Sequence, residues 1–439
     1  MKSLLIRAED KNRWERRAPI IPADLVQIID ETGATAYIEQ SEKRFFKAPA
    51  YISAGASLCD GMAGGDVILG VKEIPEEKIL DGKTYLFFSH TIKGQKSGMP
   101  LLKKIIDSGA TLIDYEKITD ENNRRLVFFG RYAGDAGAID ILSLMGEYWA
   151  HHGLTTPFAQ CRRAHQYASV EDAKTHMRAI GEKIRTEGIP PALSPMVIGL
   201  LGYGNVSGGA QQIFDCLPVE RVAPEALKSF VDAGKGDPNT VYLSVFKEKD
   251  LVEAKDGGTF DLQEYYDHPE RYQGRFEPYL PCITILVNAV YWESRYPRFV
   301  TWDGLKRMKE NHPQAKLCGI ADITCDTHGS IECNERSTGS DMPAYLCDPM
   351  TRTTTDGHLG EGIVLLAVDN LPCELPNDAS SFFSNQLKPF VPNLLKADYG
   401  RTLETSGLCP EIQKAVIVYN GKLTKDYEYL NAHLQKQDK

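Results

Sequence analysis

The sequence lacks any hydrophobic stretch long enough to cross a membrane. None of its apolar runs approaches the roughly 20 residues that a membrane-spanning helix requires. It also lacks the start of a secretory signal, because charged residues appear as early as Arg7 and Glu9. We therefore expect a soluble, cytoplasmic protein with no membrane partner.

An excess of positive charge is absent as well. With 50 Lys and Arg residues against 60 Asp and Glu residues, the formal net charge is −10. Nucleic acids and acidic membranes attract basic surfaces, so no nucleic-acid partner is expected. The hydrophobic content of 42% is that of an ordinary globular protein, and the length of 439 residues predicts two or three domains.

Spacings typical of metal sites are scarce. The cysteines form no CxxC pair, and the histidines form no HExxH or similar zinc-binding pattern. Cys325 and Cys333, with His328 between them, are one arrangement that suggests a metal. The alternative is that the cysteines are reduced thiols packed as small hydrophobic residues, as is usual in the cytosol. We favour the second interpretation and expect no metal.

Apolar runs alternate with helical patterns along the chain, which predicts an α/β fold. The expected strands of the first part cover residues 3–7, 36–39, 66–71, 84–88 and 111–114, and its expected helices cover 22–33 and 101–109. Later strands are expected at 282–291, 316–325 and 360–369, after a polar and aromatic insertion at 252–276. Long helices are expected at 134–150 and 170–186, and helical segments from 373 to the C-terminus.

The segment Val197–Ala210 reads as an apolar strand, a glycine turn and the start of a helix. Gly202 and Gly204 allow a tight turn and a close approach of backbone to ligand, so that helix N–H groups can hold a pyrophosphate. The spacing is G-x-G-x-x-S, with Ser207 where Gly or Ala is usual. The alternative is a turn that needs glycine for packing only. The context of strand and helix favours dinucleotide binding and hence a redox enzyme.

The residue that meets the adenosine ribose is not settled by the sequence. NAD sites usually place an acidic residue at the end of the second strand. Around the segment Leu217–Pro224, Glu220 fits that role, whereas Arg221 fits a 2′-phosphate. Both alternatives stay open.

Polar side chains follow several strands expected in the first part. Lys72 and His90 each come directly after an apolar run, at the sheet edge where α/β proteins bind ligands. They fit an acid–base pair, or else a surface lysine and a capping histidine. Arg17, between the first strand and helix, fits a carboxylate clamp or a solvated loop. The segment Asp114–Glu116 follows another strand in the same way.

Several long blocks of the sequence are specific enough to compare with known families. They are Arg7–Asp10, Trp14–Pro19, Leu69–Lys72, Phe87–Lys93, Leu112–Lys117, Gly204–Ser207, Asp267–Tyr272, Tyr291–Glu293, Ala321–Asp326 and Asp369–Pro372. These blocks resemble the lysine–ketoglutarate reductase half of the bifunctional aminoadipic semialdehyde synthase family. A more distant likeness extends to lysine-forming saccharopine dehydrogenase and to alanine dehydrogenase.

The resemblance implies an α/β fold of two Rossmann-like domains flanking a cleft, with C-terminal helices returning to the first domain. It implies a substrate-binding domain at residues 1–134, completed by residues 375–439. Residues 135–374 are then the nicotinamide-dinucleotide-binding domain. The family continues into a second, saccharopine-cleaving domain, so we expect this sequence to be a free-standing reductase half.

The implied reaction condenses L-lysine with 2-oxoglutarate and reduces the imine to saccharopine, or runs in reverse. The resemblance implies NADPH as the cofactor, with NADH as the alternative. Small molecules are the expected partners, and a homo-oligomer is one option. Two other functions stay open: an NAD-linked dehydrogenase of another amino or opine acid, and a non-catalytic dinucleotide-binding protein.

The resemblance also implies roles for individual residues. Lys72 and His90 become the acid–base pair, without a decision on which is the acid. The implied substrate-binding residues are Arg17, Glu73, Glu116, Arg125 and Phe129. The implied cofactor-binding residues are Gly202, Gly204, Asn205, Val206, Ser207 and, on the nicotinamide side, Asp322.

Overall fold

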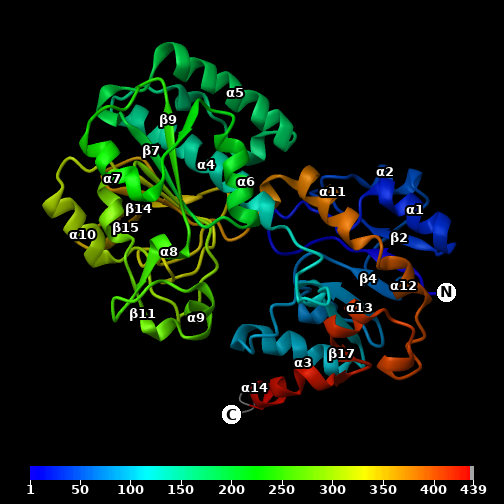
Figure 1. Ribbon diagram of the computed structural model, residues 1–439. Helices are drawn as coiled ribbons and strands as arrows, with labels where there is room; N and C mark the ends of the chain where they lie inside the picture. Colours follow the sequence, from blue (N-terminus) through cyan, green and yellow to red (C-terminus); the bar gives the residue numbers. More distant parts are fainter. Residues whose placement is uncertain (436–439) are drawn as a thin grey trace. The chain divides into compact units, whose positions relative to one another are not determined.

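The computed structural model describes residues 1–435 and shows two compact α/β units. The first unit combines two separate segments, Met1–Phe129 and Pro376–Lys439, and the second is the continuous segment Gly130–Leu375. In Figure 1 the chain leaves the first unit in cyan and returns to it in orange. Within the described residues, no helix has both the length and the hydrophobicity needed to span a membrane.

Parallel strands form the body of the sheet in the first unit. In sheet order they are β6 (Thr111–Asp114), β5 (Thr84–Phe87), β4 (Val67–Leu69), β1 (Leu4–Ile6), β2 (Ala36–Glu39) and β3 (Ser57–Cys59). Helices α1 (Pro22–Thr32), α2 (Ala48–Ser53) and α3 (Met99–Asp107) are the crossovers that parallel pairing requires. Every residue of β1, β4, β5 and β6 is buried, which explains their continuous apolar runs.

The C-terminal segment of this unit contains the expected helices and also two strands that were not expected. Helices α11 (Pro376–Leu387), α12 (Val391–Lys396) and α13 (Pro410–Ala415) precede the hairpin of β17 (Val416–Tyr419) and β18 (Lys422–Leu423), and α14 (Asn431–Leu434) follows. β17 pairs antiparallel with β6 and extends the sheet at that edge. An apolar run of four residues cannot be told from a buried helical turn by periodicity, which is why the strand was missed.

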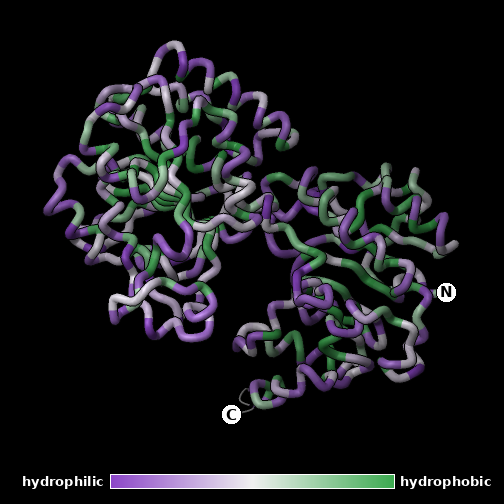
Figure 2. Tube along the Cα trace, in the orientation of Figure 1, coloured by the Kyte–Doolittle hydropathy of each residue, from purple (hydrophilic) through white to green (hydrophobic). Residues whose placement is uncertain are grey.

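The second unit contains a parallel sheet with helices on both faces. Its order is β8 (Val219–Arg221), β9 (Val241–Phe246), β7 (Met196–Leu201), β12 (Ile285–Asn288), β13 (Gly319–Asp322) and β16 (Ile363–Leu366), then antiparallel β14 (Ala344–Asp348) and β15 (Thr353–Asp356). Helices α4 (Gly130–His151), α5 (Val170–Glu187) and α6 (Asn205–Phe214) pack on one face, and α7 (Pro224–Asp232) and α10 (Trp302–Asn311) on the other. Figure 2 shows the hydrophobic strands enclosed within the unit.

The order of strands in this sheet differs from their order along the chain. β8 follows α6 directly, yet it lies at the edge of the sheet and pairs with β9. β9 lies between β8 and β7 and pairs with β7 along its whole length. The carboxyl end of β9, not that of β8, is therefore the neighbour of the turn that follows β7.

An insertion follows β9. It comprises α8 (Glu248–Leu251), the antiparallel pair β10 (Val252–Ala254) and β11 (Tyr272–Gly274), and α9 (Leu262–Asp267). This is the polar and aromatic segment at 252–276, and its two strands form a small sheet apart from the main one.

Helices α4 and α6 pack with their backbones in direct contact. A Cβ atom at Gly134 of α4 would collide with the carbonyl oxygen of Val206. A Cβ atom at Gly209 of α6 would in turn collide with the carbonyl oxygen of Arg131. Glycine at both positions permits this close approach, so α4 fixes the position of α6 on the sheet.

Candidate functional site

The turn after β7 leaves the N-terminus of α6 open to an anion. Gly202 has a φ of +93°, and its N–H donates to the carbonyl of Phe246 at 2.9 Å. A Cβ atom here would lie 3.0 Å from the carbonyl oxygen of Ala289, so glycine is required. Gly204 is the N-cap of α6, and no side chain of the described residues caps the helix. The backbone N–H groups at 205–207 can therefore bind a pyrophosphate.

Ser207 occupies the position where such turns usually carry Gly or Ala. Its side chain is buried, and its Oγ accepts a hydrogen bond from Nε2 of Gln211 at 3.0 Å. The close packing that a third glycine permits occurs two residues later, where Gly209 meets α4. Ser207 is therefore compatible with the turn, because a different glycine takes over the packing role.

Neither of the residues suggested for the ribose lies next to the glycine turn along the sheet. Glu220 and Arg221 belong to β8, the edge strand. The guanidinium of Arg221 donates to the side chains of Gln211 and Asp215, each at 2.8 Å. The residue that follows the neighbouring strand β9 is Lys247, which sequence reasoning missed because strand order is not visible in the sequence.

Asp322 is the last residue of β13 and is held inside a polar cluster of the second unit. Its carboxylate accepts hydrogen bonds from Nδ2 of Asn288 at 2.8 Å and Nδ2 of Asn334 at 2.7 Å. The hydroxyl of Thr324 donates to it at 2.8 Å. Burial raises the pKa of Asp322, and these hydrogen bonds oppose that rise. Asp322 and the glycine turn thus lie at the same carboxyl edge of the sheet.

Lys72 lies in the first unit, in the loop that begins where β4 ends. The backbone N–H groups of Val71 and Lys72 donate to the carboxylate of Glu9 at 2.7 and 3.0 Å. The buried Glu9 therefore fixes the backbone that carries Lys72. Burial lowers the pKa of Lys72, and the positive charges of Arg17 and Lys11 lower it further. This is the shift that a lysine needs to act as a base near neutral pH.

His90 follows β5 and is oriented by Glu73. Its Nδ1 is hydrogen bonded to Oε1 of Glu73, in the same loop as Lys72. Burial acts to raise the pKa of Glu73, but the hydrogen bond and charge of His90 lower it to about 2. No hydrogen bond engages Nε2 of His90 or Nζ of Lys72 within residues 1–435. The two side chains therefore each offer a nitrogen for proton transfer.

The backbone at His90 takes an uncommon conformation. Its φ is +52°, in the left-handed region. The preceding residue, Ser89, donates through its backbone N–H and its hydroxyl to Oδ2 of Asp114. Oδ1 of the same carboxylate accepts the backbone N–H of Glu116 at 2.8 Å. One buried aspartate thus fixes the loops after both β5 and β6.

Arg17 is buried and faces two partners within the first unit. Its Nε and Nη2 donate to the carboxylate of Glu15 at 2.8 and 2.6 Å. The guanidinium lies 4.2 Å from the ring centroid of Phe129, which stacks on Phe383 at 4.3 Å. Since Arg17 and Glu73 both act on the pKa of Lys72, the structure brings these three sequence-predicted residues together.

Glu116 and Arg125 form an ion pair beside a cavity of about 500 Å³. Lys414 and Tyr427, from the C-terminal segment, also line this cavity. The hydroxyl of Tyr429 donates to the carbonyl of Ile92 at 2.6 Å, and so connects the segment to the loop after His90. The C-terminal segment, which was expected to complete this domain, therefore also contributes to the surroundings of Glu116 and Arg125.

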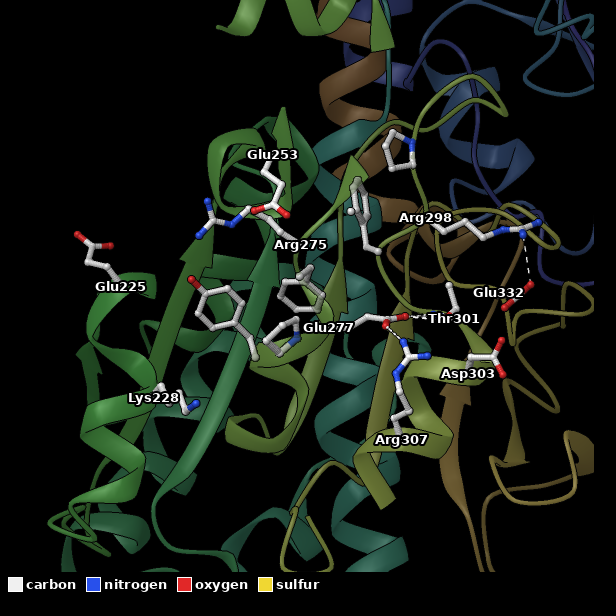
Figure 3. A pocket seen from close by; sticks show the side chains of 16 residues that line it. Glu225, Lys228, Glu253, Arg275, Glu277, Arg298, Thr301, Asp303, Arg307 and Glu332 are labelled. Atoms are coloured by element: carbon white, nitrogen blue, oxygen red, sulfur yellow. Dashed lines mark hydrogen bonds and ion pairs between the residues drawn. The ribbon is translucent and has the colours of Figure 1, made fainter. Parts of the chain in front are cut away.

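A larger cavity, of about 1010 Å³, lies in the second unit but contains none of the predicted site residues (Figure 3). Its central charges are paired with one another. Glu277 accepts hydrogen bonds from the backbone N–H of Thr301 at 3.0 Å and from Arg307 at 2.6 Å. Arg298 pairs with Glu332 at 3.2 Å. This cavity does not belong to the predicted site.

Side chains suited to a metal are not gathered anywhere in the part of the chain that the structure describes. No group of three or more His, Cys, Asp or Glu residues among positions 1–435 is arranged to hold an ion.

Comparison with known families gives a match over two separate parts of the chain. Residues 5–136 match the model of the alanine dehydrogenase/PNT N-terminal domain, and residues 274–426 match that of the C-terminal domain. Among solved structures, an L-alanine dehydrogenase has a TM-score of 0.60 at 17% identity and covers 98% of this chain. The transhydrogenase from Sinorhizobium meliloti has a TM-score of 0.57 at 14% identity. These structural likenesses show the fold.

Curated relatives are more similar in sequence. Rat mitochondrial alpha-aminoadipic semialdehyde synthase is 37% identical over 97% of this chain, and the chain covers 47% of that protein. The synthase from Arabidopsis thaliana is 38% identical, with 41% of it covered. The chain thus spans about half the length of these relatives or less. A lysine-forming, NAD-dependent saccharopine dehydrogenase from Neurospora crassa is 26% identical and matches over 89% of its length.

Proposed function

Because the chain belongs to the alanine dehydrogenase/PNT family, we propose that it is an oxidoreductase that uses a nicotinamide dinucleotide to form or cleave saccharopine. The names of its synthase and saccharopine dehydrogenase relatives support this substrate class. The observation that carries the proposal is the pair of proton-transfer groups at the ends of β4 and β5. Lys72 has a lowered pKa, and His90 is held by Glu73.

The dinucleotide binds at the turn that follows β7. The residues Gly202, Gly204, Asn205, Val206 and Ser207 present backbone to the pyrophosphate, and Asp322 lies at the end of β13 in the same sheet. The cofactor is NADPH in this proposal, and it supplies the hydride when bound. The uncapped N-terminus of α6 and the close approach permitted by Gly202 support the assignment.

Condensation of lysine with 2-oxoglutarate needs a base first and an acid afterwards. The ε-ammonium of the substrate must lose a proton before its nitrogen attacks the keto carbon. The hydroxyl of the carbinolamine must then gain a proton so that it can leave as water. Lys72, whose pKa is lowered by burial, and Nε2 of His90 provide two groups that can exchange these protons.

The carboxylates of the substrates are assigned to arginines of the first unit. Arg17 is preorganised by Glu15 and by the ring of Phe129 behind its guanidinium. Arg125 is paired with Glu116, so a substrate carboxylate would exchange with Glu116. Glu73 and Glu116 balance the positive charge of the site and, in this proposal, meet the amino groups of the substrate.

The test is a spectrophotometric assay at 340 nm with lysine, 2-oxoglutarate and either NADPH or NADH. Oxidation of the reduced cofactor is expected, and pyruvate with ammonia serves as the substrate control. His90→Ala should lower turnover at least about ten-fold while dinucleotide binding is retained, because an acid–base group typically contributes 10²–10⁴-fold. No oxidation with either cofactor would refute the substrate pair, and unchanged turnover would remove His90 from the mechanism.

A further inference from the structure

We infer that Lys247 binds the 2′-phosphate of the dinucleotide and so makes the protein select the phosphorylated cofactor. This inference rests on the proposed dinucleotide site, but not on the identity of the substrate. In a doubly wound sheet, the strand beside the glycine-turn strand ends at the adenosine ribose. The side chain that follows this strand therefore decides which cofactor is accepted.

The sheet order identifies that strand as β9. β9 is paired with β7 from Met196–Val241 to Leu201–Phe246. The hydrogen bond from Gly202 to the carbonyl of Phe246 then holds the end of β9 against the glycine turn itself. Lys247 is the next residue, so its side chain begins beside the turn.

The ammonium group of Lys247 lies over the turn. Its Nζ is 5.4 Å from the ring centroid of Tyr203, which stands between Gly202 and Gly204 and is half exposed. No carboxylate pairs with this ammonium within the described residues, and the side chain is exposed. A cation held over the turn without an ionic partner favours a phosphate over a hydroxyl group.

The neighbouring carboxylate has another partner. Oε1 of Glu248 accepts a hydrogen bond from the hydroxyl of Tyr266 at 3.0 Å. The charge of Glu248 also raises the pKa of Tyr203, so this carboxylate lies near the turn. Glu248 is thus the one competitor among these neighbours: if it met the ribose instead, it would bind the 2′-hydroxyl of an unphosphorylated cofactor.

Arg221, the cation that the sequence offered for the 2′-phosphate, is occupied. Its guanidinium donates to Gln211 and to Asp215, and it lies on the edge strand β8. Its position outside β9 makes it a control, because it carries the same charge on a different strand.

The experiment measures binding of adenosine 2′,5′-bisphosphate and of 5′-AMP to the full chain by calorimetry. The wild-type protein should bind the bisphosphate at least about ten-fold more tightly, as expected for one charge-assisted interaction. Lys247→Ala should abolish this preference and leave 5′-AMP binding unchanged. Lys247→Arg and Arg221→Ala should both retain the preference.

The possible failures are distinguishable. Equal binding of the two probes to the wild-type protein, a preference retained by Lys247→Ala, or a preference lost in Arg221→Ala would each overturn the role of Lys247. No binding of either probe would instead overturn the dinucleotide site on which the inference rests. Because no turnover is measured, the result does not depend on whether saccharopine is the product.

Discussion

Lys72 is placed where its proposed function and the stability of the fold conflict. The half-buried ammonium is desolvated and lies near the positive charges of Arg17 and Lys11, so its pKa is lowered from 10.5. Glu15 and Glu73 oppose this shift without cancelling it. A pKa below the unfolded value means that folding disfavours the protonated lysine. This cost is fully present at pH values below the folded pKa and disappears as the pH rises towards 10.5.

Lys72→Met should therefore make the protein more stable and less active. We expect a higher urea midpoint than that of the wild type at pH 7, and a smaller difference as the pH approaches 10. Turnover should fall by about 10²-fold or more if the amine is an essential base. Urea denaturation over a pH series and initial rates measure the two effects. A lower midpoint at pH 7, or full activity, would contradict the assignment.

Two features fix the orientation of the His90 ring: its left-handed backbone and its contact with Glu73. A left-handed backbone is uncommon for residues other than glycine, although histidine adopts it more often than most, and at His90 it persists because Asp114 holds the preceding serine. The bond to Glu73 then fixes the ring. Neither feature is visible in the sequence, which showed the histidine at a strand end and nothing of its conformation.

At the scale of helices, the contact between α4 and α6 is the feature most sensitive to substitution. Gly209→Ala adds a methyl group that meets the backbone of α4, which cannot move aside as a side chain can. We expect a loss of about 1–3 kcal/mol in the free energy of unfolding, typical of overpacking. Binding of adenosine 2′,5′-bisphosphate should weaken too, because α6 presents the anion-binding N–H groups.

Gly208→Ala is the matched control for this helix. A Cβ atom at residue 208 has no neighbour within 4 Å. The substitution should leave the free energy of unfolding unchanged or raise it slightly, since alanine favours a helix over glycine. Thermal unfolding of both variants tests the contact, and equal melting temperatures would show that α4 and α6 can separate without cost.

Most strands of the first unit's sheet were predictable from their apolar runs, and their partners were not. β6 matches the expected residues, and β4, β5 and β7 lie within the expected runs or within one residue of them, because burial on both faces requires a continuous apolar run. β2 also matches, although only alternate residues of it are buried. In the second unit β9 and β14 were missed although they are almost entirely buried, and the short strands β8, β10, β11 and β15 were missed as well. In the first unit β3 and β17 were missed. β3 is a short edge strand with two exposed residues, and β17 is a short run next to a helix.

The candidate site was predictable in its residues more than in its arrangement. The strand-end rule located Lys72 and His90, and the glycine pattern located the turn at Gly202. Lys247 was not located, because the sequence does not reveal that β9 inserts between β7 and β8. That pairing is set by contacts between distant segments, whereas a motif reports on local structure alone.

At the scale of the whole molecule, the two units differ in whether one continuous segment of the chain forms them. The second unit is continuous in sequence and contains its own sheet with hydrophobic clusters on both faces. We expect residues 130–375 alone to fold and to bind adenosine 2′,5′-bisphosphate. Circular dichroism should show one cooperative thermal transition for this fragment, and the bisphosphate should raise its midpoint. A fragment without a cooperative transition would refute the expectation.

The first unit has no such independence in residues 1–129. Without the C-terminal segment, β6 loses its pairing with β17 and becomes an edge strand. All four of its residues, which are buried in the complete unit, belong to this unpaired edge. Exposed apolar edges promote aggregation. Residues 1–129 alone should therefore be insoluble, and the C-terminal segment supplied as a separate chain should restore solubility. Sedimentation of the fragment with and without that segment measures the effect.

The pairing of β17 with β6 also affects the order in which the two units can be completed during synthesis. Synthesis proceeds at about 5–20 residues per second, and domains generally fold as units. The strands β1 to β6 emerge first, yet their sheet must wait for Val416–Leu423, which emerge after the entire second unit. The unit whose strands are made first is thus completed last, and during that interval β6 lacks its partner strand β17.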